Sequence, residues 1–325
     1  MLNIILFIMI ITMVIFIFPD GKVTIVDNRV TSRPNTNVYR GWAMLIIMIC
    51  HVTGEWLFKP FTPLGGIGVA MFLFLSGFGL SESYKKNGLN KFGQKKLLRL
   101  VLPYVLFRIV CVMIEGAGNW KRLLLDICCW ESVYWYIDYM VRCYIVFWVA
   151  NRFLGKYKWV AFGAFALYTF GVMGAIRAEQ ALSFFAGVVC SDYVEKVNGW
   201  SKRTLVTIMV MMAIVGISCL AAKQLPAFRE LFDTYYYYAV ELGIKLPLGI
   251  MMMVGLYLLP QRIRKSQLLL FCGTYSLELY LVHMYIVPRV VDTSWMQAVA
   301  ALFISGLIAY SFSVVTQKII EFIKL

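Results

Sequence analysis

Residues 40–55 read Arg-Gly-Trp-Ala-Met-Leu-Ile-Ile-Met-Ile-Cys-His-Val-Thr-Gly-Glu, an apolar run that opens with an arginine, carries a histidine and ends in a glutamate. Arg40 and His51 lie about three helical turns apart, so they share one helix face and are separated by roughly 16 Å along its axis. Glu55, one turn further on, shares that face. Ionisable side chains inside an apolar helix are costly in a bilayer and indicate a function. The stretch therefore predicts a polar path into a hydrocarbon layer of about 30 Å.

The composition of the whole chain is that of an integral membrane protein. Of the 325 residues, 61% are hydrophobic and 15% are charged, and the mean hydropathy is +0.76. This leaves too little polar surface to coat a soluble globule. The net charge of +14 is what basic loops on one side of a membrane would give, so it does not imply a nucleic-acid partner.

Ten apolar runs follow Arg40 at short intervals, which predicts an all-α polytopic membrane protein with a ten-helix core. Each run is close to the roughly 20 residues that a span needs. They cover residues 40–58, 66–82, 97–116, 133–151, 158–176, 180–195, 204–222, 236–258, 267–287 and 296–317. We further expect residues 1–18 to form an uncleaved N-terminal transmembrane helix, residues 19–39 a cytoplasmic linker, and residues 40–325 one membrane domain.

The loop charges predict the orientation of these spans. Lysine and arginine concentrate in one set of alternate loops, including residues 85–99, 152–158, 196–203 and 262–265. Basic loops favour the cytoplasmic side. We therefore expect the linker and the C-terminus to be cytoplasmic and Glu55 to point outward.

The chain has only two histidines, and both are candidates for chemistry. Glu55 is placed to accept a hydrogen bond from one ring nitrogen of His51, which would prepare the other nitrogen as a general base. The alternative is a histidine that only packs between helices. His283 shares a helix face with Ser276 and Tyr280, where acceptor binding and interhelical hydrogen bonding are both open.

A basic cluster and a charge pair add further candidates. Lys95, Lys96 and Arg99 lie at the predicted cytoplasmic end of a helix, where they would hold phosphates of a cofactor or anchor the helix on anionic lipid. Asp138 and Arg142 lie one helical turn apart and can neutralise each other, which makes them either part of a polar cavity or a structural pair.

Ser76 and the cysteines call for no special chemistry of their own. Ser76 lies in a run of small residues at which two helices can approach closely, and it is interpreted as structural or pocket-lining. The cysteines show no CxxC spacing and lie mostly in apolar segments, so neither a structural disulfide nor a metal site is expected. The cysteines are Cys50, Cys111, Cys128, Cys129, Cys143, Cys190, Cys219 and Cys272.

Taken together, four segments resemble acyltransferase family 3, the integral membrane acyltransferases that include O-acetyltransferases of surface polysaccharides. Arg40 to His51 is similar to the R-x10-H motif of that family. Residues 68–78, 92–104 and 275–283 are similar to its second-helix signature, its basic stretch before a proline-tyrosine pair, and its penultimate helix. The sequence departs from the pattern at Ala70, where many members have an acidic residue.

The resemblance implies transfer of an acyl group, most often acetyl, from cytoplasmic acyl-CoA to a glycan hydroxyl at the outer face of a bacterial-type plasma membrane, without a metal. The acceptor would be a cell-surface glycan or a lipid-linked sugar, and membrane lipids would surround the protein. His51 would deprotonate the acceptor or relay the acyl group. The cations expected to hold the CoA phosphates are Arg40, Lys95, Lys96 and Arg99; Glu55 would orient His51, and the candidates for substrate contact are Ser76, Arg142, Tyr144 and His283.

Two other functions fit the same residues. A transporter or flippase would also use buried charge pairs and a continuous polar face. An inactive scaffold of a glycan-assembly complex would keep the helices without the chemistry.

Overall fold

The computed structural model describes residues 29–54, 57–116, 120–128, 132–292 and 294–324, together with Ile4, Phe7, Met9, Thr12 and Ile15. In these parts of the chain all regular structure is helical and no strand is present, so the predicted all-α class is confirmed. Glu55 lies outside the described residues. The same holds for 13 of the 18 residues of the expected N-terminal helix and for residues 19–28 of the expected linker.

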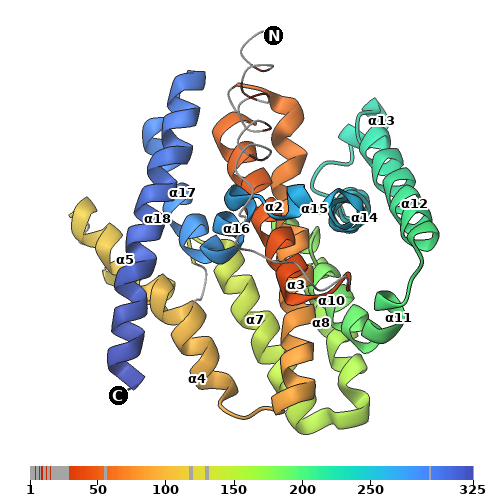
Figure 1. Ribbon diagram of the computed structural model, residues 1–325, viewed down its shortest axis with the longest axis horizontal. Helices are drawn as coiled ribbons and strands as arrows, with labels where there is room; N and C mark the ends of the chain where they lie inside the picture. The colour runs from red at the N-terminus through yellow and green to blue at the C-terminus, as the bar shows by residue number, and fades with distance from the viewer. Residues whose placement is uncertain are drawn as a thin grey trace.

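The main helices form a bundle in which α2 lies centrally (Figure 1). They are α2 (Arg33–Thr53), α3 (Thr62–Asn87), α5 (Leu102–Glu115), α7 (Trp135–Val149), α8 (Lys158–Val172), α10 (Ser183–Asp192), α12 (Lys202–Ala222), α14 (Tyr235–Leu258), α16 (Gln267–Thr274), α17 (Ser276–Val290) and α18 (Trp295–Lys324). Shorter helices are α4 (Phe92–Lys96), α6 (Trp120–Ile127), α9 (Ala175–Ala178), α11 (Val194–Asn198), α13 (Pro226–Arg229) and α15 (Gln261–Arg264). Single turns are η1 (Lys59–Phe61), η2 (Leu97–Val101), η3 (Ala150–Leu154) and η4 (Gly155–Tyr157).

Each of the ten expected spans coincides with a helix or a helix pair, but the count of ten spans is not confirmed. Among the described residues, five helical segments are long and apolar enough to cross a membrane, and a sixth is added if the bent pair α16–α17 counts as one span. Helices α7, α8 and α10 have 15, 15 and 10 residues, fewer than the roughly 20 that a straight span needs.

Helix α2 begins at Arg33 rather than at Arg40, so residues 33–39 of the expected linker are helical. The side chain of Ser32 accepts a hydrogen bond from the backbone N–H of Asn35, and Pro34 occupies the first turn. A serine cap and an early proline are strong local signals for a helix start. The cap is itself fixed, because buried Asn35 accepts a hydrogen bond from Arg264 at 3.0 Å.

Helices α3 and α10 touch backbone to backbone, which confirms the prediction that small residues in 65–80 allow close approach. A Cβ atom on Gly187 would lie 1.9 Å from the carbonyl oxygen of Phe74, and one on Gly77 would lie 2.0 Å from that of Phe184. Any larger residue at either position would force the two helices apart. This contact holds α10, and the α9 turn that precedes it, against the same helix that faces α2.

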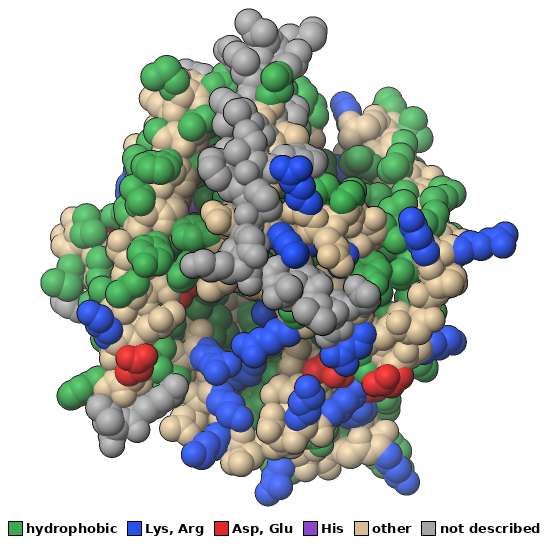
Figure 2. Space-filling model, viewed as in Figure 1, with side chains coloured by type: hydrophobic (Ala, Val, Ile, Leu, Met, Phe, Trp, Pro, Cys, Tyr) green, Lys and Arg blue, Asp and Glu red, His purple; other side chains and the backbone are tan. Residues whose placement is uncertain are grey.

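The molecule has a basic end, at which α3 ends, α4 begins and the chain terminates (Figure 1). Figure 2 shows lysine and arginine gathered on the lower part of one face, whereas the part above is largely apolar. Helix α12 exposes most of its aliphatic residues and buries only Leu205 and Gly216. An apolar outer surface of this kind suits contact with lipid.

Helices α16 and α17 meet at a bend of 86°. The bend follows Thr274 and turns the first half of α17 toward α2. Ser276, Tyr280 and His283 therefore face the helix that carries Arg40 and His51. This confirms the prediction that the three residues share one face of a helix.

Candidate functional site

Helix α2 places Arg40 and His51 in two neighbouring chambers. We call the first the basic chamber; it has a volume of about 410 Å³ and is lined by Arg40, Lys96 and Arg99 among others. We call the second the histidine chamber; it has a volume of about 240 Å³ and is lined by His51. The spacing predicted that Arg40 and His51 lie on one face of a helix. In the structure, each of the two side chains lines one of two adjacent cavities.

The basic chamber holds cations without carboxylate partners. No described acidic residue forms a salt bridge with Arg40, Lys96 or Arg99. The ammonium of Lys96 lies 4.5 Å from the centre of the Tyr144 ring, a cation–π contact. Unneutralised positive charge around one cavity favours a multiply charged anion. Lys95 is exposed and does not line this chamber.

The opposite wall of the basic chamber is polar and uncharged. Ser76, Tyr136 and Tyr144 line this wall of the cavity, and each carries a hydroxyl. Tyr144, a candidate for substrate contact, lies beside Lys96 in this chamber. Arg142 lines none of the chambers described here, because its guanidinium binds Asp138 at 2.6 Å.

Asp138 joins two helices through two arginines. It is fully buried, and its second oxygen accepts a hydrogen bond from Arg177 of α9 at 2.7 Å. The pairing of Asp138 with Arg142 within α7 is confirmed, but Arg177 adds a contact that the spacing did not predict. A buried carboxylate between two guanidiniums is best explained as a structural tie.

His51 is hydrogen-bonded to His283, which is the central feature of the site. Nδ1 of His51 lies 2.8 Å from Nε2 of His283, and Nδ1 of His283 lies 2.7 Å from the backbone carbonyl oxygen of Leu279. His283 is completely buried and does not line the chamber, whereas His51 does. His283 therefore binds the His51 ring without lining the chamber itself.

These two contacts fix the tautomer of both rings when they are neutral. A carbonyl oxygen only accepts, so Nδ1 of His283 carries a proton and its Nε2 carries a lone pair. Nδ1 of His51 must then donate to that lone pair. Nε2 of His51 is left unprotonated, which is the state that a general base requires.

The basic and histidine chambers meet at three shared side chains. Ile47, Val69 and Tyr280 line both cavities and stand between them. Arg40 and His51 are therefore not in one open channel. They line adjacent cavities that have three lining residues in common, and of these three described residues only Tyr280 carries a hydroxyl.

A third cavity continues from the histidine chamber away from the basic end. This ion-pair chamber has a volume of about 780 Å³ and shares Thr62, Gly66, Glu179 and Lys245 with the histidine chamber. Lys245 forms salt bridges with Glu179 of the loop after α9 and with Glu241, and Lys223 forms another with Glu241. These pairs make a polar wall between helices α12 and α14.

Glu179 is unusual among these carboxyls because it lies in a loop outside the long helices. Burial raises the pKa of Glu179, while the ammonium of Lys245 opposes that shift. Short-range spacing contains no signal that Glu179 meets Lys245, since they are 66 residues apart. The sequence did identify the Glu241–Lys245 pair, which is confirmed at 3.3 Å.

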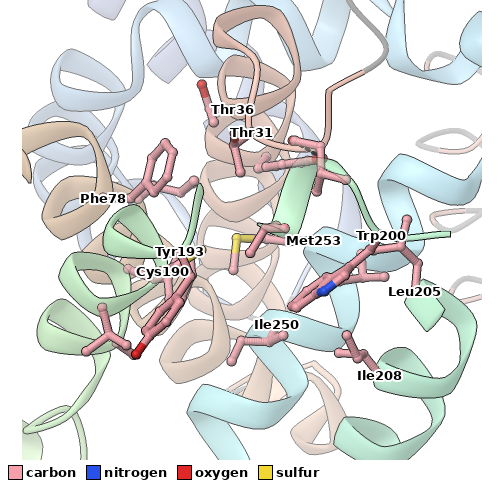
Figure 3. Close-up of a pocket in the computed structure, with 18 of the residues that line it drawn as sticks. Thr31, Thr36, Phe78, Cys190, Tyr193, Trp200, Leu205, Ile208, Ile250 and Met253 are labelled. Atoms are coloured by element: carbon pink, nitrogen blue, oxygen red, sulfur yellow. Dashed lines mark hydrogen bonds between the residues drawn. The ribbon is translucent and has the colours of Figure 1, made fainter. Parts of the chain in front are cut away.

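A separate apolar cavity lies between α2, α3, α10, α12 and α14. Figure 3 shows its wall, which includes Phe78, Trp200 and Met253. Its volume is about 570 Å³. It shares no lining residue with the three chambers above, and its chemistry suits hydrocarbon.

Metal ligands are not grouped in the parts of the chain that the structure describes. No set of three or more histidine, cysteine, aspartate or glutamate side chains is arranged there to hold an ion.

The fold and chambers define a multi-pass helical membrane protein with a buried histidine pair between a cationic cavity and an ion-paired cavity. The chain belongs to acyltransferase family 3, because residues 34–317 match the family model described as an acyltransferase domain. This confirms the resemblance noted from the four segments and assigns the protein to the membrane acyltransferases. Comparison with curated proteins and with solved structures gave no match.

Proposed function

We propose that this protein transfers an acyl group, most simply acetyl, from cytoplasmic acyl-CoA to a hydroxyl of an extracytoplasmic glycan or lipid-linked sugar. The observation that carries the proposal is the His51–His283 pair: His51 lines a chamber next to Arg40, Lys96 and Arg99, three cations to which no described carboxylate forms a salt bridge. A base and a polyanion site separated by one layer of side chains suit a phosphorylated thioester donor.

The basic chamber supports the donor assignment. Arg40, Lys96 and Arg99 would hold CoA phosphates at the basic end, which in this proposal faces the cytoplasm. The acyl thioester would then reach the layer formed by Ile47, Val69 and Tyr280. The acceptor would enter from the opposite end, through the ion-pair chamber.

The reaction follows from the tautomer of His51. Nε2 takes the proton of the acceptor hydroxyl as its oxygen attacks the thioester carbonyl carbon, and the carbonyl π electrons move to oxygen. As the tetrahedral intermediate collapses, the C–S bond breaks and the thiolate of CoA leaves. The His51 imidazolium returns its proton to that thiolate, so an ester and CoA are formed. His283 accepts the Nδ1 hydrogen bond throughout and steadies the positive ring.

Acyl transfer is tested with membrane vesicles from producing cells, in which radiolabelled acetyl-CoA is supplied to the cytoplasmic face and label is measured in surface glycan. His51→Ala should reduce label to the level of vesicles without the protein. Thr36→Ala serves as the matched control, because Thr36 lies on α2 but lines neither the basic nor the histidine chamber. Unchanged labelling in His51→Ala would refute the proposed chemistry.

A second candidate function is transport without acyl transfer. The observation in its favour is the succession of three cavities from the basic end to the ion-pair chamber. Proteoliposomes given acceptor glycan but no acyl donor distinguish the two functions. Only a transporter would accumulate unmodified glycan in that assay.

A further inference from the structure

The hydroxyl of Tyr280 is a buried polar group that the fold does not use. Tyr280 is 6% exposed, and its hydroxyl has no hydrogen-bond partner among the residues that the structure describes. A buried hydroxyl without a partner destabilises a folded protein, so such atoms are few and call for an explanation. Tyr280 is also one of the three residues that line both the basic and the histidine chambers.

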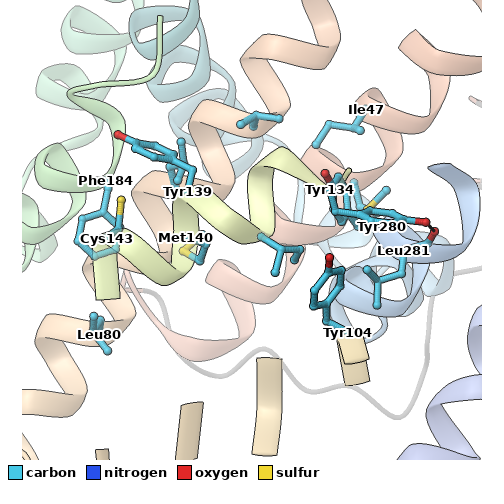
Figure 4. Close-up of a cluster of buried hydrophobic side chains, with 14 of the residues drawn as sticks. Ile47, Leu80, Tyr104, Tyr134, Tyr139, Met140, Cys143, Phe184, Tyr280 and Leu281 are labelled. Carbon is cyan, nitrogen blue, oxygen red and sulfur yellow. Dashed lines mark hydrogen bonds between the residues drawn. The ribbon is translucent and has the colours of Figure 1, made fainter. Parts of the chain in front are cut away.

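The ring of Tyr280 is held in place by its neighbours rather than by its hydroxyl. Its centre lies 5.2 Å from that of Tyr136, 5.9 Å from that of Tyr134 and 5.8 Å from that of His283, each in an edge-on contact. Figure 4 shows Tyr134 and Tyr280 together at one end of the buried cluster. The ring contacts thus hold the hydroxyl in place before a substrate binds, and no described protein atom accepts its proton.

The first turn of α7 adds a partial positive charge near this hydroxyl. Helix α7 begins at Trp135, so the backbone N–H of Tyr136 has no acceptor within the helix. Tyr136 of this first turn lies close to Tyr280, with 5.2 Å between the centres of their rings. A helix start favours developing negative charge close to it.

We propose that the Tyr280 hydroxyl is a catalytic hydrogen-bond donor to the carbonyl oxygen of the acyl thioester. This inference rests on the proposed acyl transfer. When the acceptor oxygen forms its bond to the carbonyl carbon, the carbonyl oxygen gains the π electron pair, and the Tyr280 O–H stabilises that negative charge without giving up its proton. When the C–S bond breaks, the pair returns to re-form the carbonyl, and the hydrogen bond weakens again.

The position of Tyr280 fits this role better than that of any other described hydroxyl in the two cavities. Ser76, Tyr136, Tyr144, Thr274 and Ser276 line the basic chamber but not the histidine chamber, and Thr62 lines the histidine chamber but not the basic chamber. In this proposal the phosphates of the donor lie in the basic chamber, and the attack comes from the side of His51. The thioester carbonyl must therefore lie where the two chambers meet. Tyr280 carries the hydroxyl at that place.

Tyr280→Phe tests the inference because it removes one oxygen and keeps the ring contacts. In the vesicle assay, the rate at saturating acetyl-CoA should fall roughly 100- to 1000-fold, as for loss of one oxyanion donor. The KM for acetyl-CoA should change by less than about threefold, since the contact strengthens only in the transition state. The melting temperature should stay the same or rise, because an unpartnered buried hydroxyl is removed.

Tyr139→Phe is the matched control. Tyr139 is a fully buried residue of α7 whose hydroxyl, like that of Tyr280, has no hydrogen-bond partner among the described residues, but it lines none of the three chambers. Its removal should leave both the rate and the KM as in the wild type. Both variants therefore lose one buried hydroxyl, and they differ only in the position of that hydroxyl.

The outcomes separate this inference from the proposed function. If Tyr280→Phe keeps the wild-type rate while His51→Ala loses it, the Tyr280 role is refuted and acyl transfer stands. If Tyr280→Phe loses rate and melting temperature together, the hydroxyl is structural and the inference is also refuted. If the wild type forms no ester from acetyl-CoA, the proposed acetyl transfer fails and the Tyr280 role fails with it.

Discussion

Replacing His283 is the most direct test of how the site prepares His51. His283→Leu removes the acceptor that lies 2.8 Å from Nδ1 of His51. Because His283 is fully buried, bulk water cannot take its place. His51 would then be free to adopt the tautomer in which Nε2 carries the proton and cannot act as a base.

The size of the effect follows from the single hydrogen bond that is lost. Leaving a buried donor unsatisfied costs about 1–3 kcal/mol. Since each 1.36 kcal/mol in the barrier is a factor of ten in rate, the variant should be roughly 5- to 160-fold slower. The assay is the initial rate of acetyl transfer at saturating acetyl-CoA, normalised to the amount of folded protein.

His283→Gln is the control for this experiment. The side-chain oxygen of glutamine extends about as far from the backbone as Nε2 of histidine, so it can accept the His51 hydrogen bond. This variant should keep most of the rate that His283→Leu loses. Wild-type activity in His283→Leu would contradict the tautomer argument, and equal losses in both variants would show that the acceptor is not what matters.

Three further changes have defined outcomes. Gly66→Ala would put a Cβ atom 2.4 Å from Cε of Lys245. It should therefore displace Lys245 from the place where the histidine and ion-pair chambers meet. We expect a higher KM for the glycan acceptor, measured at fixed acetyl-CoA. Lys96→Ala should raise the KM for acetyl-CoA roughly tenfold or more through loss of a charged contact, whereas exposed Lys95→Ala should leave that KM near the wild-type value. Asp138→Asn should lower the free energy of unfolding by about 3 kcal/mol, the lower end for a broken buried pair, because its arginine partners are 21% and 19% exposed; an unchanged thermal midpoint would contradict the structural role given to Asp138.

Short-range periodicity was enough to identify the helices and several faces. Apolar runs of membrane length located every main helix, because burying backbone polar groups in lipid leaves few alternatives to a helix. Spacing along a single helix correctly grouped Arg40 with His51, Asp138 with Arg142, and Ser276 with His283. The start of α2 was missed because the apolar pattern begins at Arg40, whereas the helix is set by the cap at Ser32.

The sequence by itself determined the class of protein, the membrane acyltransferase family, and the helix that carries the candidate base. Only the tertiary structure decided what that base touches, because His51 and His283 are 232 residues apart and no spacing rule connects them. The bend of 86° between α16 and α17 and the glycine contacts between α3 and α10 determine which helix faces meet. Those packing contacts placed Tyr144 beside Lys96, and they made Tyr280 the one hydroxyl among the three described residues that line both chambers.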